Sequence, residues 1–303
     1  MRLGRVLAVA AAVLMEVSAV AGSEAGKEIP FRLTHGFLIV VQGSIGPLKD
    51  LSFVVDTGAR HTVVDSSVAR TLHLQSSGSV QQSGLSGPVA MDQVSLEKIW
   101  WGRNQFTDCK VLSFDLSSIS AYLGQKIDVL LGLDLLSRED FQIDYAEQKI
   151  HFEQHAVPEN VVAFELNKPE LVVALRLEDH VLDVLLDTGS DSAAVFRNRL
   201  PKEDLPPVEA QPGHDLNGDV RFARLTAKHV RLGDVELQGV PVFVIPARPN
   251  RQGYDGSFSP SVLHAKRIYF DFERGQFGWD WPKHSKISSQ IRMHKPAEKA
   301  ESR

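Results

Sequence analysis

Two copies of an aspartate-threonine-glycine triplet are the residues of this sequence best suited to chemistry. The first begins at Asp56 and the second at Asp187, 131 residues later. Two carboxylates that lie close together cannot both ionise, so one stays protonated while the other stays basic. A water held between them can lose a proton to one carboxylate while the other protonates the carbonyl oxygen of an amide. The sequence therefore predicts acid–base hydrolysis of amides, with the two roles unassigned because such a pair titrates as a unit.

The residues that follow each aspartate fit a close contact between two loops. Thr57 and Thr188 carry hydroxyls that can hydrogen-bond across to the equivalent loop. Gly58 and Gly189 have no side chain, so another backbone can approach them closely. We expect these four residues to support the active-site loops.

The next position differs between the two copies. Ala59 follows the first triplet and Ser190 follows the second. A serine hydroxyl there can hydrogen-bond the neighbouring aspartate and favour its ionisation, whereas alanine cannot. We therefore expect Asp187 to be the more acidic partner.

The triplets belong to a longer internal repeat. A single Asp-Thr-Gly is equally typical of a hairpin or a helix-capping turn. Here LSFVVDTGA at residues 51–59 recurs as LDVLLDTGS at residues 182–190, and strand-like runs at 37–41 and 171–177 precede the two copies. Two copies in register favour the paired carboxylates over two unrelated turns.

The elements that must position the triplets are strands. Runs of β-branched and aromatic residues broken by turn residues predict a mostly β protein with two homologous domains. We expect lobes at residues 22–152 and 171–282, joined by a linker at 153–170 that contains Pro158 and Pro169. Short helices are predicted only at 66–74 and 133–139.

The two ends of the chain are not expected to belong to the fold. Residues 1–21 combine Arg2 and Arg5 with an apolar run and small residues, which is typical of a secretory signal peptide. Residues 283–303 are basic and poor in apolar residues, so we expect a solvated, disordered tail. No segment is long enough to predict a stable membrane span, and export to the periplasm or the exterior follows as a prediction.

Composition argues against nucleic-acid binding, disulfide bonding and metal binding. A net charge of −5 gives no broad cationic face for nucleic acid. Cys109 is alone, so an intramolecular disulfide and a thiolate-rich metal site are excluded, and we expect a buried, inert thiol. His151 and His155 lie four residues apart outside any predicted helix, which argues against a metal site. No metal or organic cofactor is expected.

These motifs resemble those of the retropepsin-like aspartic proteases. The resemblance covers residues 37–279 and rests on the two triplets and on DVLLGLDLL at residues 128–136. It implies two acid-protease β-barrel lobes in a pseudo-two-fold arrangement, with Asp56 and Asp187 as the catalytic pair. It also implies an apolar-apolar-glycine element, Leu130-Leu131-Gly132, that packs behind the first loop. In the second half the looser counterpart is the segment around Gly256.

The resemblance also implies flaps, the hairpins that close over a bound peptide. The candidates are two glycine-containing segments, formed by Gly84, Leu85, Ser86 and Gly87 in the first half and by Gly213 to Gly218 in the second. Neither segment contains the tyrosine that pepsin-like enzymes carry in the flap. Having both triplets in one chain resembles the bilobal pepsin arrangement more than the retroviral homodimer.

Together these features predict an exported aspartic endopeptidase that acts on an extended peptide or protein. The alternative is a catalytically inactive relative that keeps the cleft as a peptide-binding or interaction module. That alternative explains the degenerate second half, but it gives no reason for both carboxylates to persist. A monomer is the expected state, and a homodimer that pairs through one half only is the further possibility left open.

Overall fold

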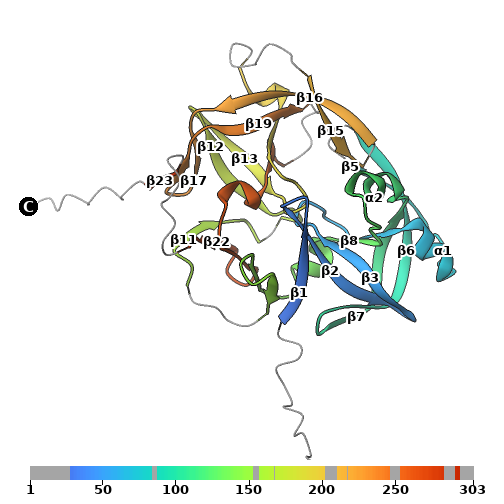
Figure 1. Cartoon of the computed structure of the whole chain (residues 1–303). Helices are drawn as coiled ribbons and strands as arrows, with labels where there is room; N and C mark the ends of the chain where they lie inside the picture. Colours follow the sequence, from blue (N-terminus) through green and yellow to red (C-terminus); the bar gives the residue numbers. More distant parts are fainter. Residues whose placement is uncertain are drawn as a thin grey trace, which may run out of the picture.

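The computed structural model describes residues 28–83, 87–152, 157–166, 168–201, 210–216, 218–245, 253–282 and 291–293, and Figure 1 shows the path of the chain. Strands dominate, and they are arranged in two sheets that build two lobes. The prediction of a mostly β protein with two retropepsin-like lobes is confirmed. No helix among these residues has both the length and the hydrophobicity needed to cross a bilayer.

The first half of the chain contains ten strands and three short helices in the described residues. The strands are β1 (Glu28–Thr34), β2 (Leu38–Ile45), β3 (Leu48–Val55), β4 (Val63–Asp65), β5 (Gly78–Ser83), β6 (Pro88–Trp101), β7 (Asn104–Phe114), β8 (Val129–Leu131), β9 (Phe141–Asp144) and β10 (Lys149–His151). The helices are α1 (Ser66–Thr71), α2 (Ser117–Leu123) and α3 (Leu133–Leu136).

The second half is built on the same plan with fewer helical residues. Its strands are β11 (Asn160–Ala163), β12 (Val172–Leu177), β13 (His180–Leu186), β14 (Ala193–Phe196), β15 (Ala210–Asp215), β16 (Gly218–Ala227), β17 (Val230–Leu232), β18 (Val235–Leu237), β19 (Val240–Ile245), β20 (Gly256–Phe258), β21 (Arg267–Asp271), β22 (Gln276–Asp280) and β23 (Ile291–Met293). Two 3-10 helices, η1 (Arg197–Arg199) and η3 (Pro260–Leu263), complete the described elements.

Each half repeats one mixed arrangement of four strands around its Asp-Thr-Gly triplet. In the first half β8 runs parallel to β3 and antiparallel to β4, and β4 runs parallel to β7. In the second half β20 runs parallel to β13 and antiparallel to β14, and β14 runs parallel to β19. The internal repeat in the sequence is therefore a repeat in topology.

Strands from both halves form one shared sheet, in the order β11-β22-β21-β9-β10-β1. β9 and β21 meet antiparallel at its centre, where Gln142 faces Tyr269 and Phe141 faces Phe270. Two further strands of each half flank this central pair symmetrically, which fits a pseudo-two-fold axis between the lobes. A continuous core runs beneath the sheet, and the rings of Phe141 and Phe270 lie 4.8 Å apart within it. The two lobes are therefore packed as one unit.

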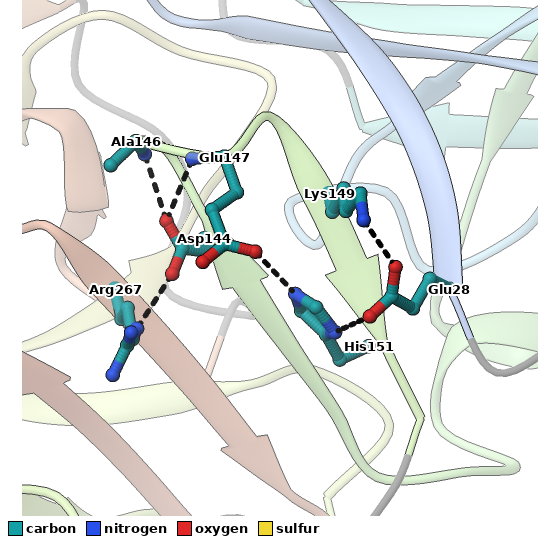
Figure 2. Close-up of polar contacts among 7 residues, drawn as sticks. All are labelled: Glu28, Asp144, Ala146, Glu147, Lys149, His151 and Arg267. Carbon is teal, nitrogen blue, oxygen red and sulfur yellow. Dashed lines mark hydrogen bonds and ion pairs between the residues drawn. The ribbon is translucent and has the colours of Figure 1, made fainter.

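Polar contacts reinforce the shared sheet at its first-half end (Figure 2). Asp144, which is 1 % exposed, accepts hydrogen bonds from Arg267 of the second half at 2.6 Å and from the amides of Ala146 and Glu147. Glu28 at the start of β1 contacts Lys149 at 2.5 Å and His151 at 3.2 Å, which ties β1 to β10. A second-half arginine thus compensates a buried first-half carboxylate.

The structure corrects three expectations about where elements lie. β11 falls inside the predicted linker 153–170 and pairs with β22, because the run from Asn160 to Ala163 is a short apolar strand. β23 falls inside the predicted tail 283–303 and pairs with β18. The helix α2, Ser117–Leu123, was not predicted because serine is a weak helix former, and Gly124 ends it in the left-handed conformation. The signal peptide prediction concerns residues outside those described, and the lone Cys109 is buried as expected.

Candidate active site

Asp56 stands at the end of β3, where the neighbouring strand β8 fixes its backbone. Val55 lies opposite Leu131, and the Asp56 amide donates to the Leu131 carbonyl at 3.1 Å. The chain then turns, so that the amides of Gly58 and Ala59 donate to the Asp56 Oδ1 atom at 3.0 and 3.1 Å. The carboxylate is therefore held at the end of the sheet by the backbone of its own loop, and the residue is half-buried.

Asp187 occupies the equivalent place at the end of β13. Leu186 lies opposite Phe258 of β20, and the Asp187 amide donates to the Phe258 carbonyl at 3.0 Å. The Gly189 amide donates to the Asp187 Oδ1 atom at 2.8 Å. Among the described residues this carboxylate accepts one backbone hydrogen bond where Asp56 accepts two. The two aspartates thus share a position in the fold but differ in their hydrogen bonds.

The two loops grip each other through their threonines. The Thr57 amide donates to the Thr188 hydroxyl at 3.0 Å, and the Thr188 amide donates to the Thr57 hydroxyl at 3.1 Å. Each hydroxyl then donates across to the other half, to the Leu186 carbonyl and the Val55 carbonyl, both at 2.7 Å. Thr57 is 0 % exposed and Thr188 is 3 % exposed. The four bonds satisfy buried polar groups reciprocally and lock the loops together.

The glycines of the triplets leave room for the opposite carboxyl group. A β-carbon at Gly58 would lie 2.5 Å from the Cγ atom of Asp187, and one at Gly189 would lie 2.8 Å from the Cγ atom of Asp56. Neither distance is compatible with a side chain unless a carboxyl group moves. Each aspartate therefore rests against the loop of the other, and the predicted pair is brought together in space.

Burial is the main reason why both carboxyl groups titrate above their ordinary range. It raises the pKa of Asp56 to about 6 and the pKa of Asp187 to about 8. The negative charge of Asp56 raises the pKa of Asp187 further, while the amides of Gly58 and Ala59 lower the pKa of Asp56. The interaction between the two carboxyl groups lowers the pKa of Asp56 and raises the pKa of Asp187. The pair therefore holds one shared proton near neutral pH, with Asp187 as the side that favours it.

This order reverses the expectation that Asp187 is the more acidic partner. The Ser190 hydroxyl does not bond the aspartate. It donates to the Ser192 carbonyl and accepts from the Ser192 amide, both at 3.4 Å. A serine hydroxyl after a turn can bond the nearby backbone instead of a neighbouring side chain, and here it bonds Ser192.

The apolar-apolar-glycine element of the first half lies behind the Asp56 loop, as predicted. Leu130 and Leu131 belong to β8, and a β-carbon at Gly132 would lie 2.5 Å from the His61 carbonyl carbon. The amide of Leu133 donates to the Ala59 carbonyl at 2.8 Å. Gly132 is therefore required where the two backbones touch.

Two residues that support this loop were not predicted. The Asp134 Oδ1 atom accepts from the Thr62 amide at 2.9 Å and from the Thr62 hydroxyl at 2.7 Å, and that hydroxyl accepts from the Gly132 amide at 3.1 Å. Burial raises the pKa of Asp134, while the hydrogen bonds from Thr62 lower it. The signal was an aspartate two residues after Gly132, which we had read only as part of a short helix.

The second half uses Ser259 at the position of Gly132. Phe258, like Leu131, accepts the amide of its aspartate, so the residue after it is the equivalent of Gly132. The Ser259 hydroxyl donates to the Ser190 carbonyl at 2.5 Å. A hydroxyl–carbonyl bond therefore replaces the close backbone contact of the first half.

The structure corrects the placement of Gly256, which we expected to match Gly132. Gly256 lies in β20, and a β-carbon there would come within 2.0 Å of the Ala194 carbonyl oxygen. A glycine is needed here because β14 approaches closely. The residue equivalent to Gly132 is Ser259, three positions later. The error arose because the two halves were matched by glycine identity rather than by strand register.

The first flap candidate lies on the β5–β6 hairpin. Ser83 pairs with Pro88 at the last described pair of the two strands. Gly84, Leu85 and Ser86 lie outside the described residues, and Gly87 follows them. The structure therefore shows an antiparallel strand pair on either side of this candidate, and its role as a flap stays a prediction.

The second flap candidate lies on the β15–β16 hairpin, which reaches α2 of the first half (Figure 1). Asp215 pairs with Gly218 at the turn, and Gly218 has a φ of 104° that favours glycine. Gly213 pairs with Val220 within the strands, so it is not at the tip. Leu216 of the turn packs against the first-half cluster that contains Leu116 and Leu123.

Comparison with known proteins agrees with this geometry. A family model described as aspartyl protease matches residues 41–135 and 173–260. The two stretches cover more than half of the chain, and each contains one Asp-Thr-Gly triplet. No curated protein matches the chain. Because both halves match, the chain belongs to the aspartyl protease family and carries two retropepsin-like units in tandem.

Proposed function

We propose that this protein is an exported aspartic endopeptidase that hydrolyses peptide bonds with Asp56 and Asp187. The observation that carries the proposal is the reciprocal grip, which holds the two carboxyl groups against each other's loops. Membership of the aspartyl protease family supports the same chemistry. A structural pair of loops would not need two buried carboxyl groups whose mutual repulsion costs stability.

The proposed reaction uses one proton shared by the pair. Asp56 accepts hydrogen bonds from two backbone amides and takes a proton from a water. The water oxygen then attacks the carbonyl carbon of the scissile peptide bond. Asp187, the side that favours the proton, gives it to the carbonyl oxygen. The tetrahedral intermediate then collapses as Asp56 returns its proton to the leaving nitrogen and the C–N bond breaks. Asp187 recovers a proton from one hydroxyl as the new carboxyl group forms, so the pair ends as it began.

We propose that the substrate binds as an extended strand beneath the two hairpins. β5 is the last strand of one sheet and β15 is the last strand of the other. Such edge strands expose backbone donors and acceptors that can pair with a peptide. Main-chain bonds would then set the register of the scissile bond over the pair.

Export and a monomeric state are also proposed. The sequence of residues 1–21 supports a signal peptide, and a periplasmic or secreted location follows from it. Both Asp-Thr-Gly loops of the site come from one chain, which supports a monomer. Light scattering on the purified protein tests this, and a mass of two chains would contradict it.

A single assay tests the reaction. The mature chain from Gly22 onward is incubated with a mixed peptide pool from acid to neutral pH, and the products are identified by mass spectrometry. Asp56→Asn and Asp187→Asn serve as paired controls, with circular dichroism to show that each variant folds. We expect cleavage by the wild type and a loss of about 10³-fold or more in each variant.

Two results would count against the proposal in different ways. Cleavage that survives either substitution would remove the paired-carboxylate mechanism. A folded wild type that binds peptides but cleaves none at any pH would favour the inactive binding module.

A further inference from the structure

A pocket of about 350 Å³ lies beside the Asp56 loop and has no role in the reaction above. One wall consists of Arg60 and His61, four and five residues after Asp56, together with residues of α3. The other wall consists of residues 164–166 and 168–171, which precede β12. Its volume is in the range that holds one or two amino-acid side chains or a small ligand.

Both walls are bonded to the loops that carry the catalytic aspartates. On the first wall, Leu133 donates to the carbonyl of Ala59 at 2.8 Å. On the second, the Leu171 carbonyl accepts the amide of Leu186 at 2.9 Å, and Leu186 precedes Asp187. The pocket therefore lies next to the backbone of both loops that carry the catalytic pair.

Most of the charged groups that line the pocket have partners. Asp134 accepts two hydrogen bonds from Thr62, and Lys168 contacts Glu165 at 3.0 Å. Glu170 lies near Lys168 and raises the pKa of its ammonium group. Arg60 is different, because it is exposed and its side chain makes no hydrogen bond or ion pair with any described residue. A guanidinium group is thus available to a ligand.

The remaining lining of the pocket is mainly apolar. Leu133, Leu171 and Phe272 contribute to it, and Phe164 packs edge-on against Phe272 with ring centroids 5.8 Å apart. An apolar floor beside an unpaired guanidinium suits a group with a short hydrocarbon stem and a carboxylate. Arginine binds carboxylates through two parallel hydrogen bonds, which gives geometric selectivity over an amide.

The second half does not repeat this combination. The equivalent of Arg60, by the 131-residue repeat, is Asp191, which is also exposed. The equivalents of Leu133 and Asp134 are Pro260 and Ser261, which follow Ser259. At this pair of equivalent positions the two halves therefore carry opposite charges.

We infer that this pocket is a subsite that takes a carboxylate-bearing residue of the peptide, with Arg60 as the residue that determines this specificity. The inference rests on the proposed peptidase function and names its substrate class. Two sources supply the same chemistry, a glutamate side chain within the peptide or the carboxylate at its C-terminus. The unpaired charge of Arg60 and the absence of a counterpart in the second half support a preference at one flank of the scissile bond only.

The test varies the best-cleaved peptide from the pool at each position on both sides of the scissile bond. Glutamate is compared with glutamine at each position, and the C-terminal acid with the C-terminal amide. We expect the wild type to favour one carboxylate form by about tenfold in kcat/KM. Arg60→Gln should abolish that preference and Arg60→Lys should restore part of it, whereas the exposed Arg32→Gln is the matched control and should retain it.

A binding arm separates failure of the inference from failure of the proposed function. The probes are acetyl-Leu-Glu-amide, acetyl-Leu-Gln-amide and acetyl-Leu with a free carboxylate, titrated into the Asp187→Asn protein and followed by NMR. Preferential shifts of the Arg60 side-chain signal by either carboxylate probe support the subsite even if no peptide is cleaved. Equal affinity for all three probes, or a preference that Arg60→Gln retains, would overturn it.

Discussion

The two halves of the molecule position their aspartates with the same backbone bonds but support them with different side chains. In each, the amide of the aspartate donates to a parallel neighbouring strand, at Leu131 or at Phe258. Behind the first loop, Asp134 and Thr62 form a buried network, while the second loop relies on the hydroxyl of Ser259. Strand order therefore decides where the carboxyl groups lie, and the side chains behind them are free to diverge.

The side chains on the four matched strands also differ between the two halves. In the first half Val54, Val63 and Leu130 belong to one apolar cluster. The matching register in the second half holds Leu185, Ala194 and Ser257. The Ser257 hydroxyl is buried and makes no hydrogen bond. The second half has thus lost apolar volume where the first has kept it.

The reciprocal hydrogen bonds of Thr57 and Thr188 are the feature in which the two halves agree best. Removing either hydroxyl should therefore cause an equal and large loss of stability. Thr57→Val and Thr188→Val each leave a buried carbonyl and a buried amide without partners. We expect each to lower the free energy of unfolding by about 3 kcal/mol in denaturant titrations. The double variant should lose less than the sum, because both threonines belong to one network. A difference of more than about 2 kcal/mol between the single variants would show that the two sides are not equivalent.

The charge state is where the halves differ most, and pH should expose it. Both aspartates have folded-state pKa values above the ordinary 3.8, so the folded protein holds protons that the unfolded chain releases. Stability conferred in this way is complete below the unfolded pKa and is lost as pH rises through the folded values. We therefore expect the free energy of unfolding to fall as the pH rises from 5 to 8.

The matched variants assign this slope to one side. Asp187→Asn should flatten the upper part, between about pH 6 and pH 8, and leave the lower part in place. Asp56→Asn should reduce the pH dependence of the free energy of unfolding across the whole range, because it also removes the charge that raises the pKa of Asp187. Denaturant titrations at half-unit pH steps give the measurement, and a rise in stability from pH 5 to 8 would contradict the assignment.

Substitutions in the apolar layer that differs between the halves should change the free energy of unfolding in opposite directions. Leu130→Ser places a polar group in an apolar cluster, and we expect it to destabilise the protein by about 3 kcal/mol. Ser257→Ala removes a buried hydroxyl that has no partner, and we expect a gain of up to about 1 kcal/mol. Thermal unfolding of both variants tests this. Destabilisation by Ser257→Ala would mean that the hydroxyl bonds a buried water.

Sequence patterns predicted the paired loops because their requirements are local. An apolar strand, an aspartate, a hydroxyl and a glycine are all needed within a few residues, and the repeat at 131 residues doubles the evidence. The same offset fails beyond the loops, since the connections in the two halves differ in length. Matching Gly256 to Gly132 was therefore wrong, although strand register shows that Ser259 is the equivalent residue.

Features that depend on distant partners could not be predicted in this way. The short run at β11 becomes a strand because β22 offers a free edge, and nothing in its own residues outweighs the neighbouring prolines. The helix α2 contains three serines, and its place is fixed by burial of Leu123 at its end. The proton order of the aspartates depends on burial and on which backbone amides reach each carboxyl group, and these follow from the folded loops rather than from residue types alone.

The smallest predicted effect concerns Ala59 and Ser190, the pair of positions at which the two loops first differ in type. Because the Ser190 hydroxyl bonds the backbone of Ser192, removing it should leave the Asp187 carboxyl group unaffected. In Ser190→Ala the basic limb of the pH–rate profile, which reports Asp187, should move by less than about 0.3 unit. In Ala59→Ser the new hydroxyl can bond the His61 backbone in the same way, so the acidic limb, which reports Asp56, should move as little. An upward shift of a full unit in Ser190→Ala would contradict this geometry, because it would show that the hydroxyl bonds the Asp187 carboxylate and lowers its pKa. A shift in Ala59→Ser alone would instead show that the first loop, with its two amide donors, has room for a third, and that the loops differ by more than one side chain.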